Sequence, residues 1–182
     1  MSMPADRDTA DRLRVGILGA GPVTQAIHLP TLARLSQDFE VRVVMDVHAA
    51  TAERVARRAN AAHTTRAEDV FADPGVDVIV ICSPSQFHAE QVIAACRAGV
   101  KAILCEKPFA MTAEEANEIA QVSEETGVPI IVGAMHTFDP AWLAAEAKRV
   151  VVVGTVNRDV VHAVVLAGER HIAAHRRCQA HE

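Results

Sequence analysis

Residues 13–24, "LRVGILGAGPVT", combine a short aliphatic run with a glycine-rich turn. The run ends at Gly19 and is typical of a buried strand, because Arg14 is its only polar residue and the residues after it show no polar face. Pro22 stands where a helix takes its first turn, a position that tolerates the missing N–H of proline. The stretch therefore predicts a strand, a tight turn and a helix in direct succession.

Strands and helices continue to alternate along the chain. Runs that are apolar almost throughout, separated by helical segments, indicate a parallel sheet covered on both faces. We therefore expect an α/β fold, a doubly wound parallel sheet of the Rossmann type, with only the start of a second α/β domain. The further strands are predicted at 40–46, 76–82, 100–106 and 128–134, and the helices at 22–35, 49–60, 67–74, 85–99 and 112–127.

Three residues mark helix boundaries or breaks. Thr112 precedes Glu115 by three positions, the arrangement of a capping box, so a helix begins there. Gly99 stands at the C′ position of the preceding helix. Pro30 lies within the first predicted helix and is expected to kink or interrupt it.

The composition excludes several classes of partner. Half of the 182 residues are apolar, only six are aromatic, and the net charge of −5 comes without a basic stripe, so nucleic acid is not an expected partner. The four cysteines stand singly, as reduced and packed thiols do in the cytosol. The polar N-terminus has no apolar core of a signal peptide, and no apolar stretch is long enough for a bilayer. These features predict a cytoplasmic protein with no membrane partner.

The ends of the strands are where a ligand is expected, since open α/β sheets bind ligands beyond the carboxyl ends of their strands. Gly19 permits a tight turn, and Gly21 lets the backbone approach a pyrophosphate at the start of a helix. Thr24 replaces the third glycine of the usual pattern, which predicts looser helix–strand packing and a hydroxyl that can bind a phosphate. Taken alone, the pattern also fits a plain strand–helix turn.

Asp46 ends the second predicted strand, 25 residues beyond Gly21. An acid at this place accepts hydrogen bonds from ribose hydroxyls and repels a 2′-phosphate. The residues that follow it are Val47 and His48, so no arginine stands there to bind the 2′-phosphate of NADP. NAD is therefore favoured over NADP. The alternative is a turn aspartate that caps the next helix, and the two roles are compatible.

The later strand ends complete a resemblance. The segments "ICSPSQFH" (81–88) and "LCEKPF" (104–109), together with "GAGPVT" and Asp46, resemble the Gfo/Idh/MocA family of oxidoreductases over residues 14–142. The resemblance implies a dinucleotide-binding domain followed by a mixed α/β domain whose open sheet shapes the substrate pocket. It also implies reversible, NAD(P)-dependent oxidation of a hydroxyl on a sugar, cyclitol or related polyol.

The resemblance also assigns roles to single residues. Ser83, Pro84 and His88 match the loop under the nicotinamide ribose, and Glu106 matches an acid that contacts this ribose. Lys107 matches the lysine beside the reacting hydroxyl, and Pro108 matches a proline that is often cis. The expected catalytic residue is Lys107, and the expected cofactor-binding residues are Gly19, Gly21, Pro22, Val23, Thr24, Asp46, Ser83, Pro84, His88, Glu106 and Lys107.

Elementary chemistry supports a lysine in this role. Hydride leaves a carbinol carbon more readily as the hydroxyl proton departs, so the site needs a group that handles a proton. An oxidised nicotinamide and partial burial favour the neutral form of Lys107, whereas Glu106 acts in the opposite direction. The alternatives are a solvated Glu-Lys turn at the strand end and, for His88, a purely structural hydrogen bond.

The sequence departs from the family beyond the dinucleotide-binding part. We expect a flexible N-terminus at 1–13, an NAD(P)-binding domain at 14–138, a linking helix and first strand of an incomplete substrate domain at 139–167, and a tail at 168–182. The Asp and His that the family's second domain contributes have no match, since Asp159 and His162 lie in the wrong context. A truncation or a frame change near residues 150–168 is the explanation we expect.

The tail offers one alternative. His171, His175, Cys178 and His181 are spaced four, three and three residues apart, which can align ligands for zinc or nickel on one helix face. Scattered histidines in a basic terminal segment are more often solvated, so no metal site is expected.

Three functions therefore stand open at this point. The first is an NAD-dependent sugar or polyol oxidoreductase. The second is an NAD-binding remnant without turnover, and the third is a subunit that borrows its substrate surface from a partner. The predicted strand at 160–166 cannot be stable alone, so we expect it to pair with another chain, as in a homo-oligomer, or to fold back on this one.

Overall fold

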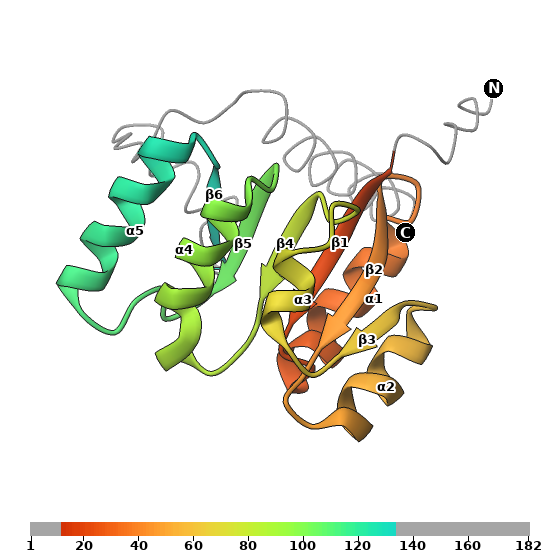
Figure 1. Cartoon of the computed structure of the whole chain (residues 1–182). Helices are drawn as coiled ribbons and strands as arrows, with labels where there is room; N and C mark the ends of the chain where they lie inside the picture. The colour runs from red at the N-terminus through yellow and green to blue at the C-terminus, as the bar shows by residue number, and fades with distance from the viewer. Residues whose placement is uncertain (1–11, 134–182) are drawn as a thin grey trace, which may run out of the picture.

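The computed structural model describes residues 12–133, which form one sheet of six parallel strands with helices on both faces (Figure 1). The order of the strands across the sheet is β3-β2-β1-β4-β5-β6. Their bounds are β1 Leu13–Leu18, β2 Phe39–Met45, β3 Ala62–Thr64, β4 Val78–Ile81, β5 Ala102–Glu106 and β6 Ile130–Gly133. The predicted doubly wound parallel sheet is confirmed.

The order of the strands reverses at β1. The chain proceeds from β1 to β2 and β3 on one side, then crosses to β4, β5 and β6 on the other, so β1 pairs with both β2 and β4. In such a sheet the helices after β1 and β4 lie on opposite faces, and their separation leaves a crevice at the carboxyl ends of these strands. The topology therefore predicts a ligand site between the ends of β1 and β4.

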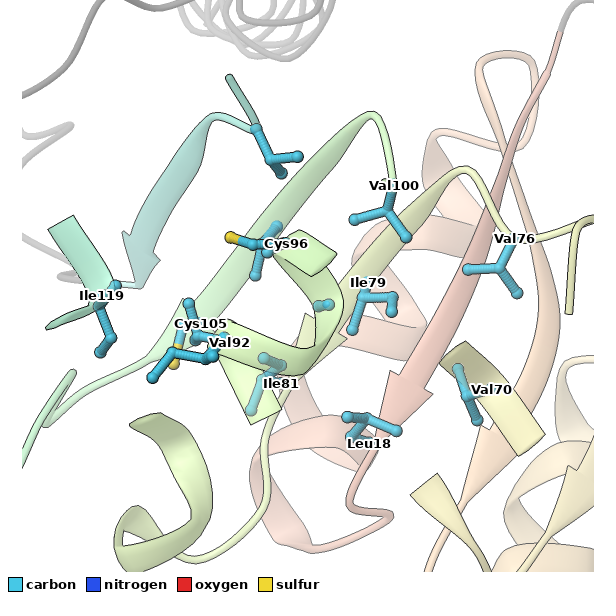
Figure 2. Packing of buried hydrophobic residues seen from close by; sticks show 14 of the residues in the cluster. Leu18, Val70, Val76, Ile79, Ile81, Val92, Cys96, Val100, Cys105 and Ile119 are labelled. Carbon is cyan, nitrogen blue, oxygen red and sulfur yellow. The ribbon is translucent and has the colours of Figure 1, made fainter. Parts of the chain in front are cut away.

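Two apolar clusters fill the space between the sheet and its helices. One joins α3, α4 and α5 to their face of the sheet, and Figure 2 shows Ile81 and Cys105 from the strands near Val92 of α4. The other cluster packs α1 and α2 against the opposite face. The helical segments are η2 Thr24–His28, α1 Leu29–Arg34, α2 Ala49–Arg58, α3 Ala67–Phe71, η3 Ser85–Phe87, α4 His88–Ala98 and α5 Ala113–Thr126.

Pro30 interrupts the first helix as expected, and the structure shows how. The chain is helical from Pro22, widens to a π-helix over η2 and returns to α-geometry in α1, where Pro30 lies in the first turn. The N–H of Leu29 reaches back five residues to the carbonyl of Thr24. Since proline has no N–H to donate and its ring crowds the preceding turn, the wider turn accommodates it.

The predicted helix ends are confirmed. Gly99 adopts the left-handed conformation, with φ +73°, after α4. At α5 the hydroxyl of Thr112 accepts the N–H of Glu115 at 3.1 Å. The carboxylate of Glu115 accepts the N–H of Met111, one residue before the position that a standard capping box uses.

One strand was missed by the sequence. β3 comprises three residues at the edge of the sheet, and its first two, Ala62 and His63, are exposed. It therefore has no apolar run from which a strand can be predicted, and only its pairing with Val43–Met45 of β2 makes it part of the sheet.

Charged residues connect the amino-terminal ends of three strands, at the end of the sheet opposite the predicted ligand site. The carboxylate of Asp77, before β4, accepts bonds from the Arg14 guanidinium at 2.8 Å and from Lys101 Nζ at 3.0 Å. Burial alone raises the pKa of Asp77, but the bonds from Arg14 and Lys101 outweigh burial and hold this pKa well below its ordinary value. The network ties the starts of β1, β4 and β5 together.

Several expectations about the chain can be compared with the described residues. Cys82, Cys96 and Cys105 are free, as expected. Within residues 12–133, no helix is both long and apolar enough to cross a bilayer, and no group of three or more metal-ligating side chains gathers. The N-terminus at 1–11, the linking helix, the strand at 160–166, Asp159, His162 and the histidine-containing tail lie outside the described residues, so their expectations stay predictions.

Candidate functional site

The turn after β1 lies against the end of β4. Gly19 has a φ of +92°, and a Cβ built on it lies 2.7 Å from the backbone of both Cys82 and Ser83. Distances this short do not occur for real Cβ atoms, so glycine is required here twice, by its backbone conformation and by the close approach. The expectation of a tight turn at Gly19 is confirmed.

Gly21 differs from Gly19 in both respects. Its φ is not in the left-handed region, and a Cβ built on it meets nothing within 4 Å. Packing among the described residues therefore does not require glycine at this position. The space beside the loop is open, at the start of a helical segment whose first N–H groups are not bonded within the helix.

Thr24 does not play the part expected for it. The residue is fully buried, and its hydroxyl donates to the carbonyl of Gly19 at 2.5 Å. The packing is therefore not loosened at Thr24, and the hydroxyl is engaged within the loop. Any contact of this segment with a phosphate falls to backbone N–H groups, with Pro22 and Val23 at the exposed start of the helix.

Gln25 forms hydrogen bonds to the same loop, a contact that was not predicted from the sequence. Its Nε2 donates to the carbonyl of Ala20 at 2.8 Å, and its Oε1 accepts from Arg54 at 3.1 Å and from Arg58 at 3.2 Å. The loop is thereby linked to α2 across the face of the sheet. A glutamine has no distinctive spacing in the sequence, so only the fold reveals this link.

Asp46 accepts hydrogen bonds in the turn before α2 but does not cap that helix, and its ribose contact stays a prediction. One carboxylate oxygen accepts the N–H of Ala20 at 2.9 Å, and the other accepts the N–H of His48 at 2.9 Å. His48, not Asp46, is the N-cap residue of α2. The carboxylate is half-buried and fixes the glycine loop, and each oxygen retains a lone pair for a further donor such as a ribose hydroxyl.

His88 takes the structural role. Its side chain is buried, with Nδ1 2.8 Å from the carbonyl of Pro108 and Nε2 2.8 Å from the carbonyl of Ser83. The Ser83 hydroxyl donates to Gln91 of α4 at 2.6 Å, and Pro84 is exposed. The loop after β4 therefore presents backbone and Pro84 to a ligand, while the His88 ring lies beneath it.

Glu106 is paired with a histidine that the sequence did not indicate. Its Oε1 lies 2.8 Å from Nε2 of His28, and both side chains are about 15% exposed. Its Oε2 accepts the backbone N–H of Lys107 at 3.3 Å. His28 lies on η2, 78 residues earlier in the chain, and a lone histidine on a helix carries no sequence signal for such a contact.

Lys107 stands apart from this pair. Its side chain is exposed, and within residues 12–133 its ammonium forms no ion pair or hydrogen bond. The acid and base that adjoin in the sequence thus do not pair through their side chains. The Lys107–Pro108 peptide bond is cis, as the resemblance implies.

The cysteines at this edge are not nucleophiles at neutral pH. Burial raises the pKa of Cys82 to about 12, and Glu106 adds to the shift. Burial also raises the pKa of Cys105 to about 12, with smaller contributions from Cys82 and Glu106. The thiols therefore stay protonated, and covalent cysteine chemistry is not supported at this site.

The exposed large apolar residues share a position in the chain. In the described part of the chain, the large apolar residues that remain exposed all follow the carboxyl end of a strand, after β1, β2, β4 or β5. They are Val23, Ile27, Val47, Phe87 and Met111, and Val47 is 72% exposed. Val23 lies two residues beyond Gly21 and Val47 directly follows Asp46, so apolar surface adjoins both the glycine loop and this acid.

Comparison with known proteins agrees with this geometry. The family model GFO_IDH_MocA, described as an oxidoreductase family with an NAD-binding Rossmann fold, matches residues 13–134. Inositol 2-dehydrogenase of Paracoccus denitrificans is 35% identical over 146 residues, which cover 78% of this chain and 43% of that protein. The NAD(+)-dependent scyllo-inositol 2-dehydrogenase of Bacillus subtilis is 31% identical over 83% of this chain and 43% of its own length.

A solved structure leads to the same comparison. An NAD-binding oxidoreductase from Klebsiella pneumoniae superposes with a TM-score of 0.68 and 31% identity, over 75% of this chain and 38% of that one. The chain thus spans about two fifths of the length of the curated relatives it matches.

Proposed function

The chain belongs to the Gfo/Idh/MocA family of oxidoreductases, and from this premise we propose that it binds NAD(H) for hydride exchange with a hydroxyl of a sugar, cyclitol or related polyol. The proposal assigns the adenosine half of the cofactor to the ends of β1 and β2, and the nicotinamide half to the ends of β4 and β5. Each half of a doubly wound sheet binds one nucleotide in this way.

The contrast between Gly19 and Gly21 carries the proposal. Gly19 is explained by the fold itself, whereas nothing in the described fold requires glycine at position 21. A ligand whose phosphates approach the backbone explains the second glycine, because a Cβ would occupy the space that the pyrophosphate needs. The residues present therefore fit a dinucleotide.

The choice of NAD over NADP rests on Asp46. Its carboxylate is fixed by the N–H groups of Ala20 and His48, next to the glycine loop. A fixed carboxylate accepts bonds from the two hydroxyls of an adenosine ribose and repels a phosphate in the place of one of them. NADP(H) is therefore the weaker ligand in this proposal.

Proton handling is assigned to Lys107. Bound NAD⁺ supplies the hydride acceptor, so the residues have to orient the substrate and take its hydroxyl proton. The Lys107 side chain is exposed and has no partner among the described residues, so its amino group is free to contact a hydroxyl, and in its neutral form it takes the hydroxyl proton. Glu106, held by His28, is assigned to the nicotinamide ribose and not to Lys107.

The substrate class is supported by the relatives. Two of them are named as inositol dehydrogenases, and one of these names includes NAD(+). We therefore place a cyclitol first among the substrates to be tested.

The experiment is a titration of the chain with NADH, followed by the fluorescence of the nicotinamide. Gly21→Ala is expected to keep the thermal stability and lose most of the NADH affinity. Gly99→Ala is the matched control, since it replaces a glycine with φ +73° at the far end of α4. It is expected to lower the stability by about 1 kcal/mol and to leave the affinity unchanged. Unchanged NADH affinity in Gly21→Ala contradicts the proposal.

A further inference from the structure

The His88 ring connects two loops that are otherwise separate. The ladder between β4 and β5 ends at the pair Ile81–Cys105, and among the described residues no backbone hydrogen bond joins the loop at 82–87 to the loop at 107–111. Nε2 of His88 lies 2.8 Å from the Ser83 carbonyl in the first loop. Nδ1 lies 2.8 Å from the Pro108 carbonyl in the second. The ring is therefore the hydrogen-bonded link between them.

The chemistry of this link is unusual in one respect. Both partners of the ring are carbonyl oxygens, which only accept, so a neutral ring donates to one of them and an imidazolium ring donates to both. No carboxylate of residues 12–133 forms an ion pair with the ring. The side chain is 1% exposed, so water does not replace either partner without a movement of the loops.

The two loops that His88 connects lie beside the proposed nicotinamide half of the site. Ser83 and Pro108 follow β4 and β5, the strands to which the proposed function assigns the nicotinamide half of the cofactor. Ser83 also provides part of the backbone against which Gly19 packs, and Pro108 follows Lys107 directly. A shift of the Pro108 loop therefore moves the proton-handling lysine relative to the glycine turn, which stays packed against the backbone of Cys82 and Ser83.

We propose that His88 is a positioning residue that holds the Ser83 loop against the Pro108 loop and thereby sets the nicotinamide half of the site. This inference rests on the proposed function for its ligand, but its structural part does not. The ring is buried beneath the loops, so it contacts neither cofactor nor substrate. Its effect is on geometry at the ends of β4 and β5 and leaves the ends of β1 and β2 unaffected.

Two variants each remove one of the two hydrogen bonds of His88 and keep the other. The amide nitrogen of Asn reaches the place of Nδ1, and that of Gln reaches the place of Nε2. His88→Asn therefore keeps the bond to Pro108, and His88→Gln keeps the bond to Ser83. Each variant retains one bond for folding. The matched control is His63→Gln, which changes an exposed histidine of β3 on the adenosine side.

The measurement compares two ligands on the full chain. ADP occupies only the adenosine half, whereas NADH occupies both halves. Loss of one hydrogen bond and the resulting loop shift are expected to lower the NADH affinity about tenfold in both His88 variants. The ADP affinity is expected to stay at the wild-type value in both, and the control is expected to change neither. Parallel loss of ADP and NADH affinity, or loss of neither, overturns the proposal.

Amide hydrogen exchange tests the link without any ligand. Exchange at 83–87 and 107–111 is expected to be faster in both variants, with exchange at 17–21 and 44–48 unchanged. Uniformly faster exchange over residues 12–133 indicates a general loss of stability and overturns the positioning role. If the wild type binds neither ADP nor NADH, the proposed function fails, and the exchange pattern alone decides the role of His88.

Discussion

Nε2 of His28 lies 2.8 Å from Oε1 of Glu106, so a helix that follows β1 is bonded to the end of β5, across the intervening strand β4. The two side chains are about 15% exposed, in contrast to the exposed ion pairs on the helices. The contact fixes the acid that is assigned to the nicotinamide ribose. It also explains why an acid and a base stand together at the end of β5. The acid faces the fold and the base faces outward.

The pair predicts measurable coupling. His28→Ala leaves a mostly buried carboxylate without its partner, so the free energy of unfolding is expected to fall by about 1–3 kcal/mol, together with the NADH affinity. A double-mutant cycle with Glu106→Gln is expected to give a coupling of at least about 0.5 kcal/mol. The control cycle uses Arg57 and Glu53, an exposed ion pair on α2. Its coupling energy is expected to be no more than about 0.3–0.5 kcal/mol. Additive effects of His28→Ala and Glu106→Gln contradict the role given to the pair.

Asp46 predicts the preference between cofactors. Because a carboxylate that accepts ribose hydroxyls repels a 2′-phosphate, NADH is expected to bind about ten- to a hundredfold more tightly than NADPH, by titration calorimetry. Asp46→Ala is expected to reduce the ratio of NADH affinity to NADPH affinity. It is also expected to lower the NADH affinity itself, since the N–H of Ala20 loses its acceptor. Glu53→Gln on α2 is the control. Equal affinities of the wild type for the two cofactors would remove Asp46 from this role.

Lys107 predicts a separation of binding from turnover. Lys107→Met keeps the apolar stem and removes the ammonium, so NADH affinity is expected to change little. Turnover of a polyol in a complete active site is expected to fall about a hundredfold or more, the scale of general acid–base catalysis. Lys107→Arg keeps the positive charge but does not release its proton, and it is expected to be equally slow. Dehydrogenase activity that survives Lys107→Met would show that the proton passes elsewhere.

Asp77 predicts a pH dependence of stability that is independent of the site. Since Arg14 and Lys101 lower its pKa in the folded chain, the ionised form stabilises the fold at neutral pH. This contribution is complete above the ordinary pKa of about 3.9 and is lost as the pH falls from there towards the lower pKa of the folded chain. Asp77→Asn is expected to cost about 1–3 kcal/mol at pH 7, by urea unfolding.

The control for Asp77 is a surface acid. Glu53→Gln is expected to change the stability by less than about 0.5 kcal/mol. NADH affinity is expected to be unchanged in Asp77→Asn, because Asp77 lies at the amino edge of the sheet. A wild-type-to-variant difference that stays constant from pH 7 to pH 2 contradicts the assignment.

The sequence predicted what depends on local pattern. Long apolar runs gave five of the six strands, and Thr112 and Gly99 gave helix ends, because period and capping act over a few residues. β3 was missed because it is held by pairing with β2 and not by its own composition.

The site divides along the same line. The turn at Gly19 was predictable from its place after a strand, and the fold confirmed it. His28 and Gln25 were not predictable, since each becomes relevant only through a partner that the fold brings near. The hydroxyl of Thr24 was assigned to a phosphate because its competing acceptor, the carbonyl of Gly19, is a backbone atom that a side-chain pattern does not reveal.

The contact between Gly19 and the end of β4 bears on how a ligand enters and leaves. The backbone of Gly19 lies so close to that of Cys82 and Ser83 that no Cβ fits between them, so we expect a bound molecule to lie above the two strand ends and not between them. Exchange of the ligand then does not require the ends of β1 and β4 to move apart. We expect its dissociation rate to depend on the side chains and loops above the strand ends, so that replacing those loops changes the residence time while the sheet stays as it is.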